Sequence, residues 1–387
     1  MKEFGEADLE GQNILLRTDL NLPLKQGRPQ KTLRFEKYLE TIQKLAEIDA
    51  KTVILAHQGR PGREDFTSLK QHKKLLEEEL ETNVFFVESF MGSELEKTLQ
   101  EMDSGDIALM ENIRLLSEEL KEVPGEKHAE GLYVNQMAGK FDLFVNDAFS
   151  VAHRPHASIV GFPNLLDSVA GPLMEAELEN CRKIRDEFDS VVLVLGGKKP
   201  SDLIGIIESK IDSVDKVLLG GVPGEVALMA KGEDLGEKSE WIRERGLDEK
   251  QEKLEELMAE YPEKFELPSD LKNEGRSVPV EEFNGVSWDI GKETRERYSK
   301  IIREADSVLM KGPMGAYQKS PEGSQAVLEA LKECNGFTVM GGGHTSSLVK
   351  EFGYSVDDFS HVSIAGGAFV KCVSGEELPA VKPLDIS

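Results

Sequence analysis

The chain has 387 residues, 39% of them hydrophobic, and is therefore long enough for two domains that each have a core. It carries 72 Asp and Glu against 47 Lys and Arg, which gives a formal net charge of -25. A field of that sign repels polyanions, so we do not expect nucleic acid as a partner unless a local basic patch overrides the field. The acidic coat is interpreted either as a solvated surface, such as one suited to high salt, or as an acidic docking surface.

No apolar segment is long enough to span a membrane, and the N-terminal sequence MKEFGEADLEG lacks the pattern of a signal peptide. We therefore expect a cytoplasmic protein with no membrane partner. The three cysteines, Cys181, Cys334 and Cys372, lie far apart in the chain and are interpreted as buried thiols.

The first half of the chain alternates short apolar runs, which are typical of buried parallel strands, with amphipathic helical patterns. Helices are predicted over residues 34–48 and 69–80. The predicted strands cover residues 13–20, 52–59, 107–114 and 142–149. This alternation is typical of βαβ units and a parallel sheet.

The same alternation of apolar strands and amphipathic helices begins again after a helix that is predicted over residues 171–188. The predicted strands of the second half cover residues 190–197, 216–221, 307–315 and 337–343. The polar stretch over residues 231–284 predicts one helix, 248–261, followed by a loop-rich crossover.

The sequence thus predicts two doubly wound, Rossmann-like α/β domains with parallel sheets, joined by a helix and a hinge. The N-terminal domain is predicted over residues 1–170 and the interdomain helix over residues 171–188. The C-terminal domain is predicted over residues 189–370, and residues 371–387 form a tail that returns to the first domain.

Basic and hydrogen-bonding side chains follow the predicted strands of the first half. Ligands collect at the carboxyl ends of the strands in open parallel sheets, so we expect these side chains to converge. Taken singly, each arginine is better explained as an ordinary salt bridge, but together they indicate a site for a small, highly charged anion. The residues are Asp19, Asn21, Arg34, His57, Arg60, Arg114, His153, Arg154 and His156.

Glycine-rich loops follow the strands of the second half. Such loops let the backbone approach a ligand closely, and a helix that begins directly after one offers free N–H groups to a phosphate. Neither GxGxxG at the start of this half nor GxxxxGK[ST] anywhere explains them. The pattern therefore indicates a nucleotide-binding half, with loops at 196–202, 220–224, 311–317, 341–346 and 365–369.

Motifs along nearly the whole chain resemble, in order, those of the phosphoglycerate kinase family. They are LLRTDLNLPL, HQGRPG, ENIRL, FVNDAFSVAHRPHAS, VLGGKKPSD, DIGKET, KGPMGAY, GGGHTSS and SIAGGAFVKCVSGEELPAV. The longer segment AHQGRPGREDFTSLKQH and the histidine after the glycine triplet resemble the archaeal branch in particular.

The resemblance implies reversible phosphoryl transfer between 1,3-bisphosphoglycerate with ADP and 3-phosphoglycerate with ATP, in glycolysis and gluconeogenesis. It implies a phosphotransferase with a carboxyl group as acceptor and Mg²⁺ bound with the nucleotide as the cofactor. A monomer is a separate expectation that the resemblance does not supply. Such a transfer needs no general base, because catalysis depends on alignment and on charge neutralisation. The two substrates would bind to different halves, so the resemblance also implies closure about a hinge.

By motif match, the family's catalytic residues correspond to Arg34 and Lys199. The positions implied to bind phosphoglycerate are Asp19, Asn21, Arg34, His57, Arg60, Arg114 and Arg154. The positions implied to bind the nucleotide are Gly196, Gly197, Lys199, Gly220, Gly221, Lys311, Pro313, Gly315, Gln318, Gly342, Gly343, His344 and Thr345. No residue of the chain is assigned as a metal ligand.

The nucleotide half departs from many family members at four positions. Those members have a second lysine where Leu203 stands, an aspartate where His344 stands, an asparagine where Lys311 stands and a glutamate where Gln318 stands. His344 is interpreted first as a phosphate neighbour, then as a capping partner or bystander, and last as a metal ligand, because Mg²⁺ prefers oxygen. Lys311 either supplies the charge that Leu203 lacks or is a surface lysine. Gln318 can still hydrogen-bond a ribose hydroxyl.

Two other functions stay open at this point. The four departures are compatible with a catalytically silent binding protein that retains the anion site. The rhythm of strands and helices would also permit another doubly wound enzyme, such as a dehydrogenase.

Overall fold

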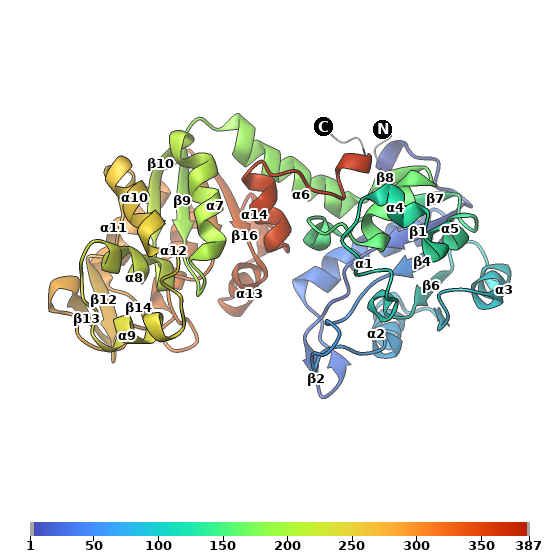
Figure 1. Cartoon of the computed structure of the whole chain (residues 1–387), viewed down its shortest axis with the longest axis horizontal. Coiled ribbons are helices and arrows are strands. Elements are labelled where there is room, and N and C mark those ends of the chain that lie inside the picture. The colour runs from blue at the N-terminus through green and yellow to red at the C-terminus, as the bar shows by residue number, and fades with distance from the viewer. Residues whose placement is uncertain (1–3, 385–387) are drawn as a thin grey trace. The chain divides into compact units, whose positions relative to one another are not determined.

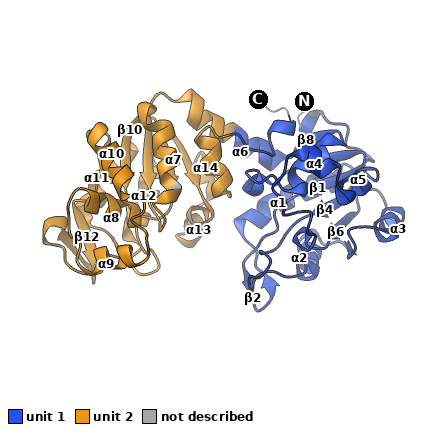
Figure 2. Ribbon diagram, viewed as in Figure 1, with its two compact units in different colours: residues 1–178, 377–387 blue, residues 179–376 orange. Residues whose placement is uncertain are grey.

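The structure is a computed structural model that describes residues 4–384, apart from the side chains of Glu6, Asp202 and His344. The chain forms two compact units (Figure 2). Unit 1 comprises Met1–Leu178 with Glu377–Ser387, and unit 2 comprises Glu179–Glu376. Within the described range, no helix has the length and apolarity needed to cross a membrane. The domain limits predicted from the sequence stay a prediction beside these units.

Unit 1 is built on a parallel sheet of six strands in the order β5-β6-β4-β1-β7-β8 (Figure 1). Its strands are β1 (Asn13–Arg17), β4 (Lys51–Leu55), β5 (Val84–Val87), β6 (Ile107–Met110), β7 (Leu143–Asn146) and β8 (Ser168–Ala170). The four strands that the apolar runs predict are all present. They are buried on both faces, and one apolar cluster on each side of the sheet forms the core of the unit.

The helices of unit 1 follow the strands in the crossover positions of a doubly wound fold. They are α1 (Leu33–Glu47), α2 (Lys70–Leu80), α3 (Ser93–Glu101), α4 (Gly125–Ala129), α5 (Leu132–Ala138) and α6 (Pro172–Arg182). Thr32 caps α1 by accepting a hydrogen bond from the Phe35 amide at 3.3 Å. A hairpin of β2 (Leu24–Lys25) and β3 (Arg28–Pro29) precedes this helix, and the division between the units lies within α6.

Unit 2 repeats this architecture with a parallel sheet in the order β11-β10-β9-β15-β16-β17. The strands are β9 (Val191–Leu195), β10 (Val214–Leu219), β11 (Phe265–Glu266), β15 (Ser307–Lys311), β16 (Phe337–Gly341) and β17 (His361–Val362). Its helices are α7 (Ser201–Lys210), α8 (Gly221–Ala230), α9 (Glu237–Glu244), α10 (Gln251–Glu260), α11 (Lys292–Arg303), α12 (Glu322–Glu333), α13 (Gly343–Glu351) and α14 (Gly367–Val373). The predicted class of two doubly wound α/β domains is confirmed.

The prediction for the polar stretch 231–284 is wrong in two respects. The stretch contains α9 before the predicted helix, which is α10, and the expected loop-rich crossover contains the first strands of a three-stranded antiparallel sheet in the order β13-β12-β14. These strands are β12 (Asp270–Asn273), β13 (Arg276–Pro279) and β14 (Asp289–Ile290). They escape the sequence pattern because they are short and polar, and because their core is a small apolar cluster around Leu271 and Phe283.

The strand orders fix where ligands are expected in each unit. In unit 1 the chain moves outward from β1 through β4, and it returns to the other side of β1 with β7. In unit 2 it moves outward from β9 through β10, and it returns to the other side of β9 with β15. Such reversals open a crevice at the carboxyl ends of the strands, so the loops after β1, β7, β9 and β15 are the functional candidates.

Candidate active site

The strand ends of unit 1 lie at one level. Arg17, the last residue of β1, is paired with Leu55 at the end of β4 and with Asn146 at the end of β7. The segments that follow these residues carry Asp19, His57 and the loop to Arg154. These segments therefore all begin at one edge of the sheet, the edge formed by the carboxyl ends of its strands, as the sequence predicts.

Asp19 is the centre of the cluster at this edge. Its carboxylate accepts a hydrogen bond from Arg34 Nη1 at 3.1 Å and from the Ser150 hydroxyl, and it lies 3.6 Å from His57 Nδ1. Burial acts to raise the pKa of Asp19, but Arg34, His57 and Ser150 together hold that pKa well below its ordinary value. Asp19 is therefore a buried carboxylate that orients the cationic groups around it.

The pKa of His57 is shifted in the direction that favours the neutral imidazole. Burial lowers the pKa of His57 well below its ordinary value; Asp19 opposes this shift, and Arg17 and Arg114 add to it. Arg17 Nη2 lies 3.3 Å from His57 Nδ1. The imidazole is therefore a hydrogen-bonding group at this edge, and the guanidinium groups supply the positive charge.

A second part of the cluster orders the loop after β4. Asn21 accepts a hydrogen bond from the Gly59 amide at 2.9 Å, and Arg114 Nη1 donates to the Gly59 carbonyl at 2.5 Å. Burial, together with the nearby Arg17, lowers the pKa of Arg114 to about 10. Arg60 follows Gly59 and is exposed. Arg114 stays charged at pH 7, so cationic groups concentrate around this loop.

Arg154 lies on the segment after β7 and is half-buried. Its Nη1 is 3.9 Å from Glu122 Oε1. Burial, together with the charges of Arg114, Arg17 and Arg154, lowers the pKa of His156 to about 3. Arg154 therefore contributes to the same positive potential as the arginines of the cluster. It differs in its partner, because it contacts Glu122, whereas Arg34 contacts Asp19 and Arg114 contacts Gly59.

Sequence reasoning missed the layer beneath this cluster. Arg17 is almost fully buried and donates from Nε to Ser158 Oγ at 2.8 Å, and the Ser158 hydroxyl donates to Glu119 Oε1 at 2.8 Å. Burial raises the pKa of Glu119, although Arg17 and Ser158 oppose the shift. The available signal was an arginine inside the run NILLR, because a charged residue in a strand buried on both faces needs a partner.

Four strands of unit 2 also end at one level. Leu195 of β9 is paired with Leu219 of β10 and Lys311 of β15, and Lys311 is paired with Gly341 of β16. The glycine-rich loops that follow these strands therefore begin side by side, and Lys311 lies between the start of the loop after β9 and the start of the loop after β16. The sequence alone left open whether Lys311 supplies the charge that Leu203 lacks or is a surface lysine.

The glycines of three loops pack against one another. Gly197 N–H donates to the Pro313 carbonyl at 2.7 Å, and Gly221 N–H donates to the Met314 carbonyl at 2.6 Å. A Cβ at Gly221 would lie 2.7 Å from the Gly197 carbonyl, and one at Gly196 would overlap the Pro313 carbonyl. Close packing of the loops thus explains why these positions are glycine, whether or not a ligand is bound. Gly220 precedes α8, and Gly315 packs on the backbone of Trp288.

The loop GGGHTSS forms the start of α13. Gly342 precedes the helix with φ of +105°, a conformation that favours glycine, and Gly343 is its first residue. Thr345 is buried; its hydroxyl accepts from the Gly312 amide at 2.9 Å and donates to the Gly341 carbonyl at 2.8 Å. The hydroxyl of Thr345 therefore ties two loops together. The side chain of His344 lies outside the described residues, so its predicted role stays a prediction.

The other predicted residues of unit 2 differ in exposure. Lys199 is exposed between β9 and α7, whereas Leu203 is buried in α7. Gln318 is exposed after β15, beside Lys319, whose Nζ lies 3.5 Å from the centre of the Trp288 ring. Cys334 is only half-buried, so the expectation of a buried thiol is wrong for that residue; Cys181 and Cys372 are buried.

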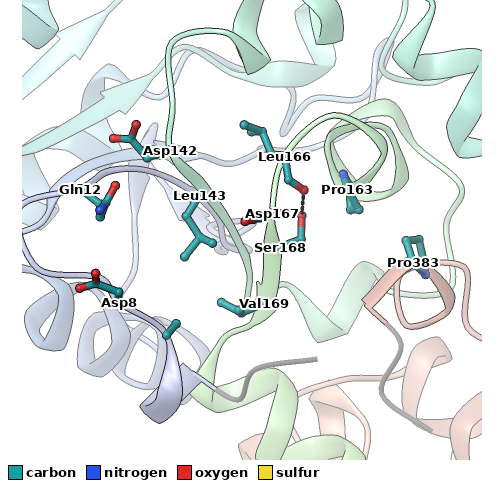
Figure 3. A pocket seen from close by; sticks show the side chains of 11 residues that line it. Asp8, Gln12, Asp142, Leu143, Pro163, Leu166, Asp167, Ser168, Val169 and Pro383 are labelled. Carbon is teal, nitrogen blue, oxygen red and sulfur yellow. Dashed lines mark hydrogen bonds between the residues drawn. The ribbon is translucent and has the colours of Figure 1, made fainter.

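A separate hollow of about 630 Å³ lies at the opposite edge of the unit 1 sheet (Figure 3). It is lined by Gln12, Asp142 and Asp167, which immediately precede β1, β7 and β8. The amino ends of the strands meet at this edge, so the hollow does not belong to the candidate site.

Comparison with known proteins agrees with this geometry. The family model described as phosphoglycerate kinase matches residues 4–376. The phosphoglycerate kinase of Halorubrum lacusprofundi is 41% identical over 96% of this chain and 95% of its own length. That of Archaeoglobus fulgidus is 38% identical over 96% of this chain and 93% of its own length.

Solved structures give the same result. The crystal structure of phosphoglycerate kinase from Pyrococcus horikoshii OT3 is similar with a TM-score of 0.91 and 32% identity, over 100% of this chain and 99% of that one. The structure of phosphoglycerate kinase from Coxiella burnetii gives a TM-score of 0.80 and 28% identity, over 99% and 98%. The protein is thus a phosphotransferase built from two α/β units. The chain belongs to the phosphoglycerate kinase family.

Proposed function

We propose that this chain catalyses reversible phosphoryl transfer between 1,3-bisphosphoglycerate with MgADP and 3-phosphoglycerate with MgATP. Membership of the family across both units carries the proposal. Under it, the acceptor in the ATP-consuming direction is a carboxyl group. The coat of negative charge, the expected cytoplasmic location and the expected monomeric state are compatible with this activity and stay predictions.

Phosphoglycerate is proposed to bind at the strand ends of unit 1. The contacts of Arg34, Arg114, His57 and Asn21 at that edge support this, because guanidinium groups match carboxylate and phosphate oxygens. Asp19 is proposed to hold Arg34 and His57 in place and to bind a substrate hydroxyl. Arg60 and Arg154 are proposed to complete the site, and both have exposed surface to reach a ligand.

The nucleotide is proposed to bind over the glycine-rich strand ends of unit 2. Gly196, Gly197, Gly220 and Gly221 are proposed to line the base pocket, and Pro313, Gly315 and Gln318 to lie near the ribose. The start of α13, with Gly342, Gly343, His344 and Thr345, is proposed to face the phosphates, because free N–H groups and the helix dipole favour anions there. Mg²⁺ is taken as part of the nucleotide substrate.

Charge neutralisation is the proposed basis of catalysis. Arg34 would stabilise negative charge on the transferred group from one side, and Lys199 with the start of α13 would stabilise it from the other. Lys311 is proposed to supply the charge that the buried Leu203 lacks, since its backbone lies between Leu195 and Gly341. No residue needs to abstract a proton, because the attacking oxygen belongs to a carboxylate or a phosphate.

A coupled assay tests the proposal. The protein is incubated with 3-phosphoglycerate and MgATP, and the acyl phosphate is trapped as it forms. Turnover that depends on both 3-phosphoglycerate and MgATP supports the kinase. Binding of 3-phosphoglycerate without turnover would support a silent binding protein, although no comparison favours that function. Absence of binding of either substrate by calorimetry would contradict the proposal.

A further inference from the structure

Asp147 joins two helices of unit 1 and takes no part in the cluster around Asp19. It directly follows β7, and its side chain is fully buried. One carboxylate oxygen, Oδ1, accepts from the amides of Leu173 and Met174 at 2.8 and 3.0 Å. The other, Oδ2, accepts from the Thr41 hydroxyl at 2.6 Å. Both oxygens are thus used, each by a different helix.

The first helix, α1, carries the proposed catalytic arginine. Arg34 lies in its first turn, and Thr41 lies seven residues further on. Seven residues correspond to almost two turns, so both side chains leave the same face of α1. The face of α1 from which Arg34 contacts Asp19 therefore also carries Thr41, which Asp147 holds two turns further along the helix.

The second helix, α6, is the one within which the chain leaves unit 1. Its first turn receives its cap from Asp147, which is 26 residues away from Leu173 in the sequence. A capping side chain normally belongs to the residue directly before the helix, whose position here is taken by Gly171. This cap therefore fixes the start of α6 to the end of β7.

The packing leaves this arrangement little freedom. A Cβ at Gly171 would overlap the Asp147 carboxylate, so the chain passes directly over that side chain. Gly171 N–H donates to the Asn146 carbonyl and Asp147 N–H donates to the Arg17 carbonyl, each at 2.9 Å. The carboxylate is thus enclosed by β1, β7 and the start of α6. A shift of α1 along its axis must either break the Thr41 bond or move the start of α6.

We propose that the hydrogen bond between Thr41 and Asp147 is a positioning link that transmits the placement of Arg34 on α1 to the start of α6. This inference rests on the proposed function, because binding of phosphoglycerate at Arg34 is the event that the link would transmit. In this proposal, neither Thr41 nor Asp147 touches the substrate. The link acts through the two helices that they hold.

Hydrogen exchange of the wild-type protein gives the first test. Burial raises the pKa of Asp147 to about 7, so the measurement is made at pH 8, where the carboxylate is mainly ionised and accepts from Thr41. Saturating 3-phosphoglycerate should slow exchange of the Leu173 and Met174 amides at least threefold. Calorimetry on the same sample measures binding independently. Binding without any change at these amides would overturn the link, whereas absence of binding would contradict the proposed function.

Three variants give the second test. Thr41→Val removes the hydroxyl at nearly constant volume, Thr41→Ser retains it, and Thr98→Val is the matched control. Thr98 is a buried helical threonine of the same unit whose hydroxyl bonds within its own helix, to Glu94 O at 3.1 Å. We expect Thr41→Val to lose the exchange response and to lower kcat at least fivefold, with the dissociation constant of 3-phosphoglycerate changed less than twofold. Thr41→Ser and Thr98→Val should keep the response and kcat.

The split between kcat and binding separates a positioning link from a merely structural bond. If Thr41→Val lowers thermal stability as Thr98→Val does but leaves kcat and the exchange response intact, the proposal is wrong. A loss of affinity as large as the loss of kcat would also overturn it, because the bond would then act only on the substrate site. The wild-type exchange experiment decides the matter if Thr41→Val does not fold.

Discussion

Arg34 Nη1 lies 3.1 Å from Asp19 Oδ2, so the proposed catalytic guanidinium is already held by a buried carboxylate. The exposed fraction of the Arg34 side chain is 24%, whereas that of Asp19 is 2%. Desolvated partners of this kind keep their geometry, which reduces the reorganisation needed when charge develops on a substrate. Asp19 therefore positions Arg34, and Arg34 retains the surface that a ligand requires.

Arg34→Ala should lower kcat by more than tenfold, or about 1.4 kcal/mol, and should weaken binding of 3-phosphoglycerate much less. The reason is that a contact formed mainly in the transition state affects kcat more than affinity. Steady-state kinetics and calorimetry check this. Arg28→Ala, at an exposed arginine of the β2-β3 hairpin, is the control and should change neither quantity. Equal losses in kcat and affinity would contradict the assigned role.

The sequence predicted the two parallel sheets because their strands are runs of apolar residues buried on both faces, as in VVLVL over β9. It did not predict β12 and β13, whose pattern DLKN and RSVP is mostly polar. Such short strands exist because they pair with one another and cover a small cluster, and neither condition is visible in one segment alone. Tertiary contacts decide their structure.

The sequence also located the edge of each sheet where candidate residues meet, because a parallel sheet brings its strand ends together. It could not tell which atoms remain available there. Thr345 matched a phosphate-binding pattern, yet its hydroxyl is engaged by Gly312 and Gly341. Arg17 was missed because its partners, Ser158 and Glu119, are distant in the sequence. Side-chain partnerships of this kind require the folded chain.

Two glycine substitutions separate loop packing from helix propensity. Gly196→Ala should destabilise the protein by roughly 1–3 kcal/mol and raise KM for MgATP, because the new Cβ overlaps the Pro313 carbonyl and forces two loops apart. Gly205→Ala, in the interior of α7 with open space around it, should instead stabilise by about 0.5–1 kcal/mol. Urea unfolding and steady-state kinetics measure both effects. Similar behaviour of the two variants would disprove the packing argument.

Asp289 should make stability depend on pH. Burial raises its pKa from 3.8 to about 7, although the amides of Gly323 and Ile290 oppose the shift. The folded state then binds a proton more tightly than the unfolded chain, so this stabilisation is complete below about pH 4 and is lost as the pH rises through 7. Relative to Asp289→Asn, the wild-type free energy of unfolding should fall by about 1.4 kcal/mol per pH unit between pH 4 and 7. A difference that is constant with pH would refute the assignment.

Thr345 offers the sharpest test of the nucleotide site. Thr345→Val removes the acceptor of the Gly312 amide and the donor to the Gly341 carbonyl, so the loop after β15 loses its tie to the start of α13. The Gly312 amide is half-buried, so loss of its partner costs at most the roughly 1–3 kcal/mol of a fully buried amide, and relaxation of the loop should convert part of this cost into weaker nucleotide binding. We expect KM for MgATP to rise about tenfold, with the affinity for 3-phosphoglycerate unchanged.

Two further variants isolate the tie between these loops. Thr345→Ser retains the hydroxyl and should keep KM for MgATP within about twofold of the wild type, which corresponds to less than about 0.5 kcal/mol. Thr338→Val is the matched control, because Thr338 is a buried threonine of β16 whose hydroxyl accepts from the Ser360 amide at 3.2 Å, away from these loops. It should reduce stability as Thr345→Val does and leave KM for MgATP unchanged. If Thr338→Val raises that KM equally, the effect of Thr345→Val is a general loss of stability, and the hydroxyl of Thr345 has no special part in holding the nucleotide loops.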